Sequence, residues 1–349
     1  MALGGLALVG ALLGGLVRIG WVLSVPATLV MFHGPLMSAG FLGTVIGLER
    51  AVALGRLWAY AAPVASGLGG LALLVGAPGG AWLMMLGSAV MVLVFAEILR
   101  RQAALFTAVM ALGALCWAIG QALWLAGEPM HHVAFWWAGF LVLTIAGERL
   151  ELTRLLRLGG PSRAAFVLAV IVLLGGLGSM PFTFVAGVRM TGVAFVALAL
   201  WLGRFDIARR TIGTSGLPRF IATALLSGYA WLGVAGLLAM RWGGVTAGPS
   251  YDAMLHAVFV GFVFSMIFGH APIIVPALLG RAVPYRPRFY VHLAVLHASL
   301  ALRIVGDLAP WPPGREWGGL VNALAIVLFF ASTAAAMVQR EHGSAQEAP

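Results

Sequence analysis

Lysine is missing from this chain, and charged residues of both signs make up only 9% of its 349 residues. A soluble globular domain carries about a quarter charged residues. Apolar residues reach 62% and the mean hydropathy is +1.02. The scarcity of charge therefore excludes a water-soluble protein and indicates an integral membrane protein.

Cysteine is almost absent as well, since Cys116 is the one example. A single thiol excludes an internal disulfide framework and an iron–sulfur cluster held by cysteines. The sequence also lacks a Walker A loop, a Gly-x-Ser-x-Gly elbow, a Cys-x-x-Cys-His attachment motif and a His-Glu-x-x-His motif. ATP hydrolysis, covalently attached haem and zincin-type proteolysis accordingly lose support.

The chain is instead filled by twelve apolar runs, most of them about as long as a membrane-crossing helix. We predict spans at residues 2–17, 27–48, 57–76, 81–99, 103–126, 130–147, 164–180, 182–201, 220–240, 253–279, 289–305 and 317–338. This pattern predicts an all-α membrane protein with one polytopic domain over residues 1–339. Residues 340–349 are polar and predict a disordered tail.

All 21 basic residues are arginines, and 16 of them fall in loops or the tail on one side of the predicted spans. By the positive-inside rule, this asymmetry places both termini in the cytoplasm, with the chain in the inner membrane of a bacterium. The net charge of +10 then reflects topology and the lipid surface, and it does not predict a nucleic-acid partner.

A phrase recurs along the chain from a histidine. Gly-Phe-Leu begins seven residues after His33 and again seven after His132, and Glu-Arg begins sixteen residues after each histidine. A fainter third copy has Gly-Phe at 261–262, with His270 where the glutamate would fall. Repeats of about residues 1–101, 102–210 and 211–339 would form three four-helix units with pseudo-threefold symmetry. Chance recurrence in a chain rich in glycine and leucine is the alternative.

Histidines are concentrated in or beside the predicted spans. The depth of each along its helix suggests an outer layer and an inner group. The outer layer holds His33, His131, His132 and His256, and the inner group holds His270, His292 and His297. Ionisable groups in hydrocarbon are costly and usually functional, and neutral imidazole is the commonest metal ligand. Two imidazoles from opposed helices predict a haem site and three or so predict copper, whereas each histidine alone could be a hydrogen-bonded core residue.

Charged side chains within the spans are few. Arg303 and Asp307 lie four residues apart, so they face one another on a helix. Arg303 could bind a haem propionate, because arginine suits carboxylates, or could form a plain intrahelical pair. Glu49 and Glu148 end their spans beside an arginine and are expected to mark the inner interface.

The run from Phe32 through His33 and Met37 to Phe41 resembles a phrase of the NnrS family, haem- and copper-containing membrane proteins of nitric-oxide tolerance. It is also similar to the His-Gly-x-x-Met phrase of haem-copper oxidases, and His256-Ala257 resembles a second NnrS phrase. The resemblance implies haem b on His33 and His256, with Met37 beside it.

The same resemblance implies optional copper on the paired histidines His131 and His132. His270 is a further candidate metal ligand. The implied partners are nitric oxide or another diatomic gas and an electron donor. Pro35 and Leu36 replace a histidine and a glutamate of the NnrS phrase, and Met254 stands where oxidases place a haem ligand. These departures argue against oxygen reduction of the oxidase type.

Two rival functions fit the same sequence. Twelve helices with repeats and buried histidines suit a secondary transporter without haem, which predicts spans broken at mid-depth by glycine and proline. A structural or assembly partner without a cofactor predicts that His33 and His256 can be replaced without effect. No catalytic residue can be assigned from the sequence, so an oxidoreductase activity stays open.

Overall fold

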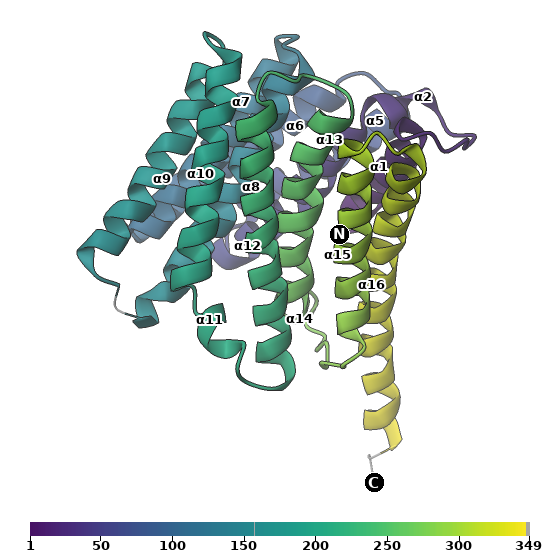
Figure 1. Cartoon of the computed structure of the whole chain (residues 1–349). Coiled ribbons are helices and arrows are strands. Elements are labelled where there is room, and N and C mark those ends of the chain that lie inside the picture. The colour runs from purple at the N-terminus through teal and green to yellow at the C-terminus, as the bar shows by residue number, and fades with distance from the viewer. Residues whose placement is uncertain (157, 347–349) are drawn as a thin grey trace. The chain divides into compact units, whose positions relative to one another are not determined.

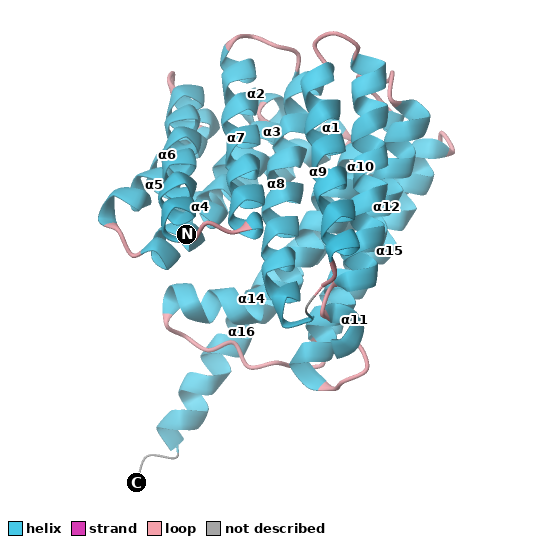
Figure 2. Ribbon diagram, turned by 90° about the vertical axis from the view of Figure 1, so that its left-hand side faces the viewer, coloured by secondary structure: helices cyan, strands magenta, loops and turns pink. Residues whose placement is uncertain are grey.

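The computed structural model of the chain describes residues 1–156 and 158–346, and within these ranges it contains helices and loops but no strand (Figure 2). The all-helical prediction is therefore confirmed. In hydrocarbon no water can bind exposed backbone groups, so a helix that satisfies its own N–H and C=O groups is the expected spanning element.

Eleven helical spans of the described residues are long and apolar enough to cross a membrane. They are His33–Leu54, Leu57–Leu74, Gly80–Arg101 (α6), Leu105–Leu125 (α7), Met130–Leu152 (α8), Gly160–Ser179 (α9), Phe184–Phe205 (α10), Gly216–Trp242 (α12), Pro249–Leu278, Phe289–Leu308 (α15) and Pro312–Met337 within α16 (Pro312–Gln346). A shorter apolar helix, α1 (Ala2–Arg18), matches the first predicted span. Such a set of helices is consistent with a multi-pass membrane protein.

The span that begins near residue 27 differs from its prediction. A short helix, α2 (Ala27–Met31), stops at Phe32, and a second helical run starts at His33 and ends only at Leu54. Proline has no N–H, so Pro35 cannot continue the backbone ladder from α2. Instead the N–H of Leu36 binds the carbonyl of Phe32 at 2.8 Å and the new run begins there.

The chain divides into two compact units. The first unit comprises Met1–Glu151 and Val170–Thr191, and the second comprises Leu152–Ala169 and Gly192–Pro349. In the first unit, α1 meets two other helices at small residues: a Cβ on Gly40 would lie 3.0 Å from the Cβ of Ala7 and 3.4 Å from the Cα of Gly70. Small residues of this kind permit the close helix packing that membrane proteins use.

In the second unit, α15 and α16 are neighbours joined by a short turn (Figure 1). Glycine permits their close approach at two levels. A Cβ on Gly318 would lie 2.7 Å from the Cα of Arg303, and a Cβ on Gly306 would lie 3.0 Å from the Cα of Arg315. The side chains between these helices are therefore shut away from solvent.

Two spans contain a π-helix of eight residues. The π-helix η1 (Leu36–Gly43) lies between α3 (His33–Pro35) and α4 (Thr44–Leu54) in the first unit. The π-helix η4 (Ala257–Phe264) lies between α13 (Pro249–His256) and α14 (Ser265–Leu279) in the second. Each has glycine as its fifth residue, and a hydroxyl just after it binds that glycine's carbonyl: Thr44 to Gly40 at 2.7 Å and Ser265 to Gly261 at 2.5 Å.

This local likeness follows the recurring Gly-Phe phrase in its first and third copies. The second copy lies on α8, which is α-helical throughout. Two of the three copies thus share a structural feature, while the threefold arrangement of repeats stays a prediction.

Candidate functional site

His33 begins a span and is held by α1. Its Nδ1 lies 2.6 Å from the carbonyl oxygen of Ala11. A carbonyl only accepts hydrogen bonds, so Nδ1 carries the hydrogen and Nε2 carries the lone pair. Gly15 makes room for the ring, because a Cβ there would lie 2.7 Å from its Cε1. Histidines that bind metals are usually oriented by a hydrogen bond of this kind.

His256 is held in the same way in the second unit. Its Nδ1 lies 2.8 Å from the carbonyl oxygen of Asp252, one turn earlier on α13, and η4 begins at the next residue. The bond fixes the same tautomer as in His33. π-Helices occur often at functional sites. An oriented histidine beside a π-helix in two spans therefore makes His33 and His256 candidate functional residues.

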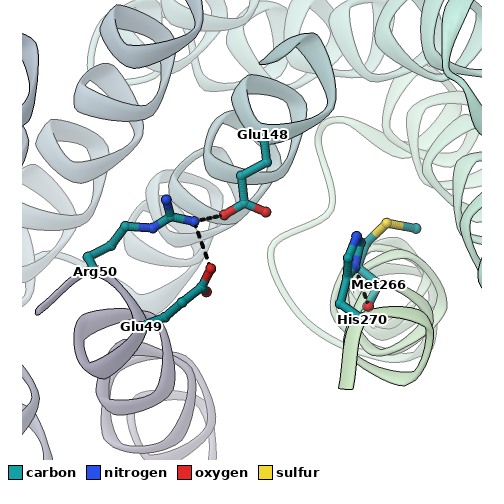
Figure 3. Close-up of polar contacts among 5 residues, drawn as sticks. All are labelled: Glu49, Arg50, Glu148, Met266 and His270. Atoms are coloured by element: carbon teal, nitrogen blue, oxygen red, sulfur yellow. Dashed lines mark hydrogen bonds and ion pairs between the residues drawn. The ribbon is translucent and has the colours of Figure 1, made fainter. Parts of the chain in front are cut away.

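Met37 and His270 are two further residues that the sequence analysis gave as candidates for binding haem or a metal. Met37 is buried on η1, one turn after His33. His270 on α14 donates from Nδ1 to the carbonyl of Met266 at 2.7 Å, as Figure 3 shows. His270 therefore shares the tautomer of His33 and His256, although sequence reasoning assigned it to an inner group.

The predicted copper histidines lie side by side in the first unit, at the start of α8. The rings of His131 and His132 are 4.7 Å apart, and both contact the ring of Phe184. His132 also pairs with Glu128, with 3.1 Å between Nδ1 and Oε2. Within residues 1–156 and 158–346, no three His, Cys, Asp or Glu side chains form a group that could hold a metal ion. Copper binding stays a prediction.

Arg303 belongs to a group of four charged side chains in the second unit, of which Arg303 and Asp307 are buried and the other two are partly buried. Arg315 contacts Asp252 at 2.7 Å and Asp307 at 2.9 Å, and Arg303 lies 3.8 Å from Asp252. Sequence reasoning paired Arg303 with Asp307 alone and missed the other two, because their contacts depend on how α13, α15 and α16 pack. Two arginines and two aspartates balance in charge, so a haem propionate would have to share Arg303 with a carboxylate already present.

In the first unit the two repeated Glu-Arg phrases meet. The guanidinium of Arg50 on α4 contacts a carboxylate oxygen of Glu49 at 3.0 Å and also one of Glu148 on α8 (Figure 3). It also lies over the ring of Phe95, 5.9 Å from the centroid. The sequence indicated only an interface position for these glutamates, whereas the structure joins them through one arginine. The recurrence of Glu-Arg in the sequence was the signal that could have indicated this contact.

His297 differs in its tautomer from the histidines described above. The indole Nε1 of Trp231 donates to the Nδ1 of His297 at 2.9 Å. Because tryptophan only donates, Nδ1 of His297 is the acceptor and the hydrogen lies on Nε2. His297 thus has the opposite tautomer to His256, which suits a hydrogen-bonded core residue.

Comparison with known proteins gives one match. A family model described as a domain of unknown function, DUF8744, matches residues 1–338. No curated protein and no solved structure matches the chain.

Proposed function

We propose a function for this chain, which belongs to the DUF8744 family, from its own residues: it is a bacterial inner-membrane protein that binds haem b. His33 and His256 would hold the haem, and both termini would be cytoplasmic. The protein handles nitric oxide or another diatomic gas, or it carries electrons, in the manner of the NnrS family that it resembles. Copper on His131 and His132 is an optional second site.

One observation carries this proposal. His33 and His256 each donate from Nδ1 to a backbone carbonyl, and each comes within three residues of an eight-residue π-helix. These hydrogen bonds place the lone pair of each imidazole on Nε2, and a metal-binding imidazole uses such a lone pair. The same pattern in two spans is hard to explain if these histidines are ordinary core residues.

Bound haem would supply an iron that changes oxidation state by one electron. With both imidazoles of His33 and His256 holding that iron, the chain would serve as an electron carrier, and gas chemistry would need the second site at His131 and His132. Arg303, which is 7% exposed, would lend positive charge to the propionates while keeping its contact with Asp252.

The experiment is a pyridine-haemochrome spectrum and a metal analysis of protein purified from haem-replete cells. We expect about one haem per chain in the wild type and strong loss in His33→Ala and His256→Ala. His342→Ala, in the polar tail, is the matched control and should keep the haem. A colourless, iron-free wild type would overturn the proposal.

The second candidate is a secondary transporter without haem. It is favoured by the interruption of two spans by π-helices, and by Pro272 and Pro276 inside α14. Irregular helices at membrane depth form the binding sites of many transporters. Substrate-dependent flux into proteoliposomes made with haem-free protein would favour this function.

A further inference from the structure

A stripe of buried polar side chains runs along α15 where it faces α16. Asp307, Arg303 and Ser299 are spaced four residues apart, and His292 follows seven residues further on. Spacings of four and seven keep side chains on one face of an α-helix. All four residues are less than 8% exposed. The sequence indicated only the pairing of Asp307 with Arg303, because the stripe mixes charged, hydroxyl and imidazole groups.

The partner helix α16 contributes polar groups at matching levels. Arg315 contacts Asp307 at 2.9 Å at one end. Near the middle, the amide nitrogen of Asn322 donates to the hydroxyl of Ser299 at 2.6 Å. Towards the other end, the hydroxyl of Ser332 lies 3.2 Å from the Nδ1 of His292.

Each level also has a buried polar atom without a hydrogen-bond partner among the described residues. These atoms are Nε of Arg303, Oδ2 of Asp307, Oδ1 of Asn322 and Nε2 of His292. Leaving a buried polar group unsatisfied costs about 1–3 kcal/mol. Four such atoms along one helix pair point to small hydrogen-bonding molecules between the levels, and bound water is the usual solution.

The stripe covers most of the membrane thickness. The fifteen residues from His292 to Asp307 rise by roughly 22 Å in an α-helix. The hydrocarbon core of a bilayer is about 30 Å thick. Apolar side chains alone could hold the two helices together, so the packing does not require polar groups over this length. Ionisable groups at membrane depth are usually functional.

We propose that Asp307, Arg303, Ser299, Asn322 and His292 form a proton pathway through the second unit, which we call the α15–α16 track. A proton arriving at one atom of a hydroxyl, carboxyl or imidazole is matched by release of another proton to the next water, so each group keeps its number of protons. The imidazole returns to its first tautomer, and the hydroxyl to its first orientation, before the next passage. Arg303 and Asn322 transfer no proton themselves and hold water by hydrogen bonds. Arg303 and Arg315 are balanced by Asp252 and Asp307, so the track has no net charge.

Protons fit this track better than metal cations do. A proton moves by rearrangement of hydrogen bonds, whereas a metal cation must exchange its hydration shell for several oxygen ligands. The track contains two guanidinium groups, and among the described residues no three His, Cys, Asp or Glu side chains form a group that could hold a metal cation. The pathway shares Arg303 with the haem proposal but contains neither His33 nor His256, so loss of haem in variants of those histidines does not decide it.

The narrowest step lies at His292, which is 1% exposed. Four phenylalanine rings surround it, with centroids 4.9 to 6.1 Å from the imidazole; they belong to Phe268, Phe329, Phe289 and Phe220. Apolar rings exclude continuous water, so passage at this level depends on the imidazole itself.

The test measures proton uptake into proteoliposomes that hold a pH-sensitive dye, driven by a potassium diffusion potential. The variants are Asn322→Leu, which removes the donor and acceptor at mid-track, and Asn322→Asp, which keeps the acceptor. Gln121→Leu is the matched control, because Gln121 on α7 is also fully buried with both amide atoms unpartnered but lies in the first unit.

We expect the wild type and Gln121→Leu to take up protons faster than protein-free vesicles. Uptake should fall at least tenfold in Asn322→Leu and be partly retained in Asn322→Asp. Should Asn322→Leu fail to fold, Ser299→Ala replaces it, with the same expected direction. The proposal is wrong if the wild type takes up protons no faster than protein-free vesicles. It is also wrong if Asn322→Leu, or Ser299→Ala in its place, takes up protons as fast as the wild type.

Discussion

Replacing Arg50 by alanine should destabilise the protein markedly, because it leaves Glu49 on α4 and Glu148 on α8 without their shared cation. The side chain of Arg50 is 13% exposed, and those of Glu49 and Glu148 are 26% and 24% exposed. Removing one partner of a fully buried ion pair costs about 3–5 kcal/mol. Because a quarter of each carboxylate remains accessible, we expect about 2–3 kcal/mol for Arg50→Ala.

Thermal unfolding in detergent measures this loss. With an unfolding entropy of about 2.1 cal/mol/K per residue over 349 residues, each kcal/mol shifts Tm by about 1.4 °C. The expected fall is therefore about 3–4 °C by the same scaling. Arg100→Ala is the matched control, because Arg100 also pairs with a glutamate, Glu97, but its side chain is 78% exposed.

The control should show no measurable shift, since exposed ion pairs contribute little. The double variant Arg50→Met with Glu148→Met should recover part of the loss, because apolar side chains of similar size replace buried ion pairs well. If Arg50→Ala unfolds at the same temperature as Arg100→Ala, the bridge between α4 and α8 contributes nothing and the reasoning fails.

Two further predictions concern packing. Gly318→Ala should lower Tm, because overpacking a tight helix contact costs about 1–3 kcal/mol. Gly5→Ala, on the exposed face of α1, is the control and should leave Tm unchanged or raise it. Equal effects of the two substitutions on Tm would contradict the close approach of α15 and α16. Cys116 is 1% exposed, so a water-soluble thiol reagent should label it only after unfolding, and rapid labelling of the native protein would show that α7 is packed differently.

The spans could be predicted well from the sequence because their signal is local. Long apolar runs with arginines at their ends identify helices whatever their neighbours are, and each predicted span has a helical counterpart in the structure. The break at Phe32 was missed because membrane helices also tolerate proline in their interior, and only the observed hydrogen bonds show that Pro35 lies in the first turn of a new helical run.

The site could be predicted only in part. Histidines stand out in an apolar chain, so His33 and His256 were visible, but their Nδ1 contacts depend on backbone geometry. The π-helices could not be recognised from hydropathy, since their residues are as apolar as those of an ordinary span. Contacts between distant residues, such as Arg50 with Glu148, follow from packing that periodicity does not encode. Haem, copper and the gas partner stay predictions.

The π-helix over Leu36–Gly43 fixes which way the two ends of its span face. A wider turn accommodates a residue that a regular α-helix would not, and each residue of an α-helix turns the chain by about 100°. Deleting one residue from this stretch would let it rewind as an ordinary α-helix, and the two ends would keep nearly the same facing. The α-helix that follows, Thr44–Leu54, has no extra residue to lose, so a deletion there would turn the residues beyond it by roughly 100° relative to the imidazole at position 33. A single-residue deletion should therefore be better tolerated within Leu36–Gly43 than within Thr44–Leu54.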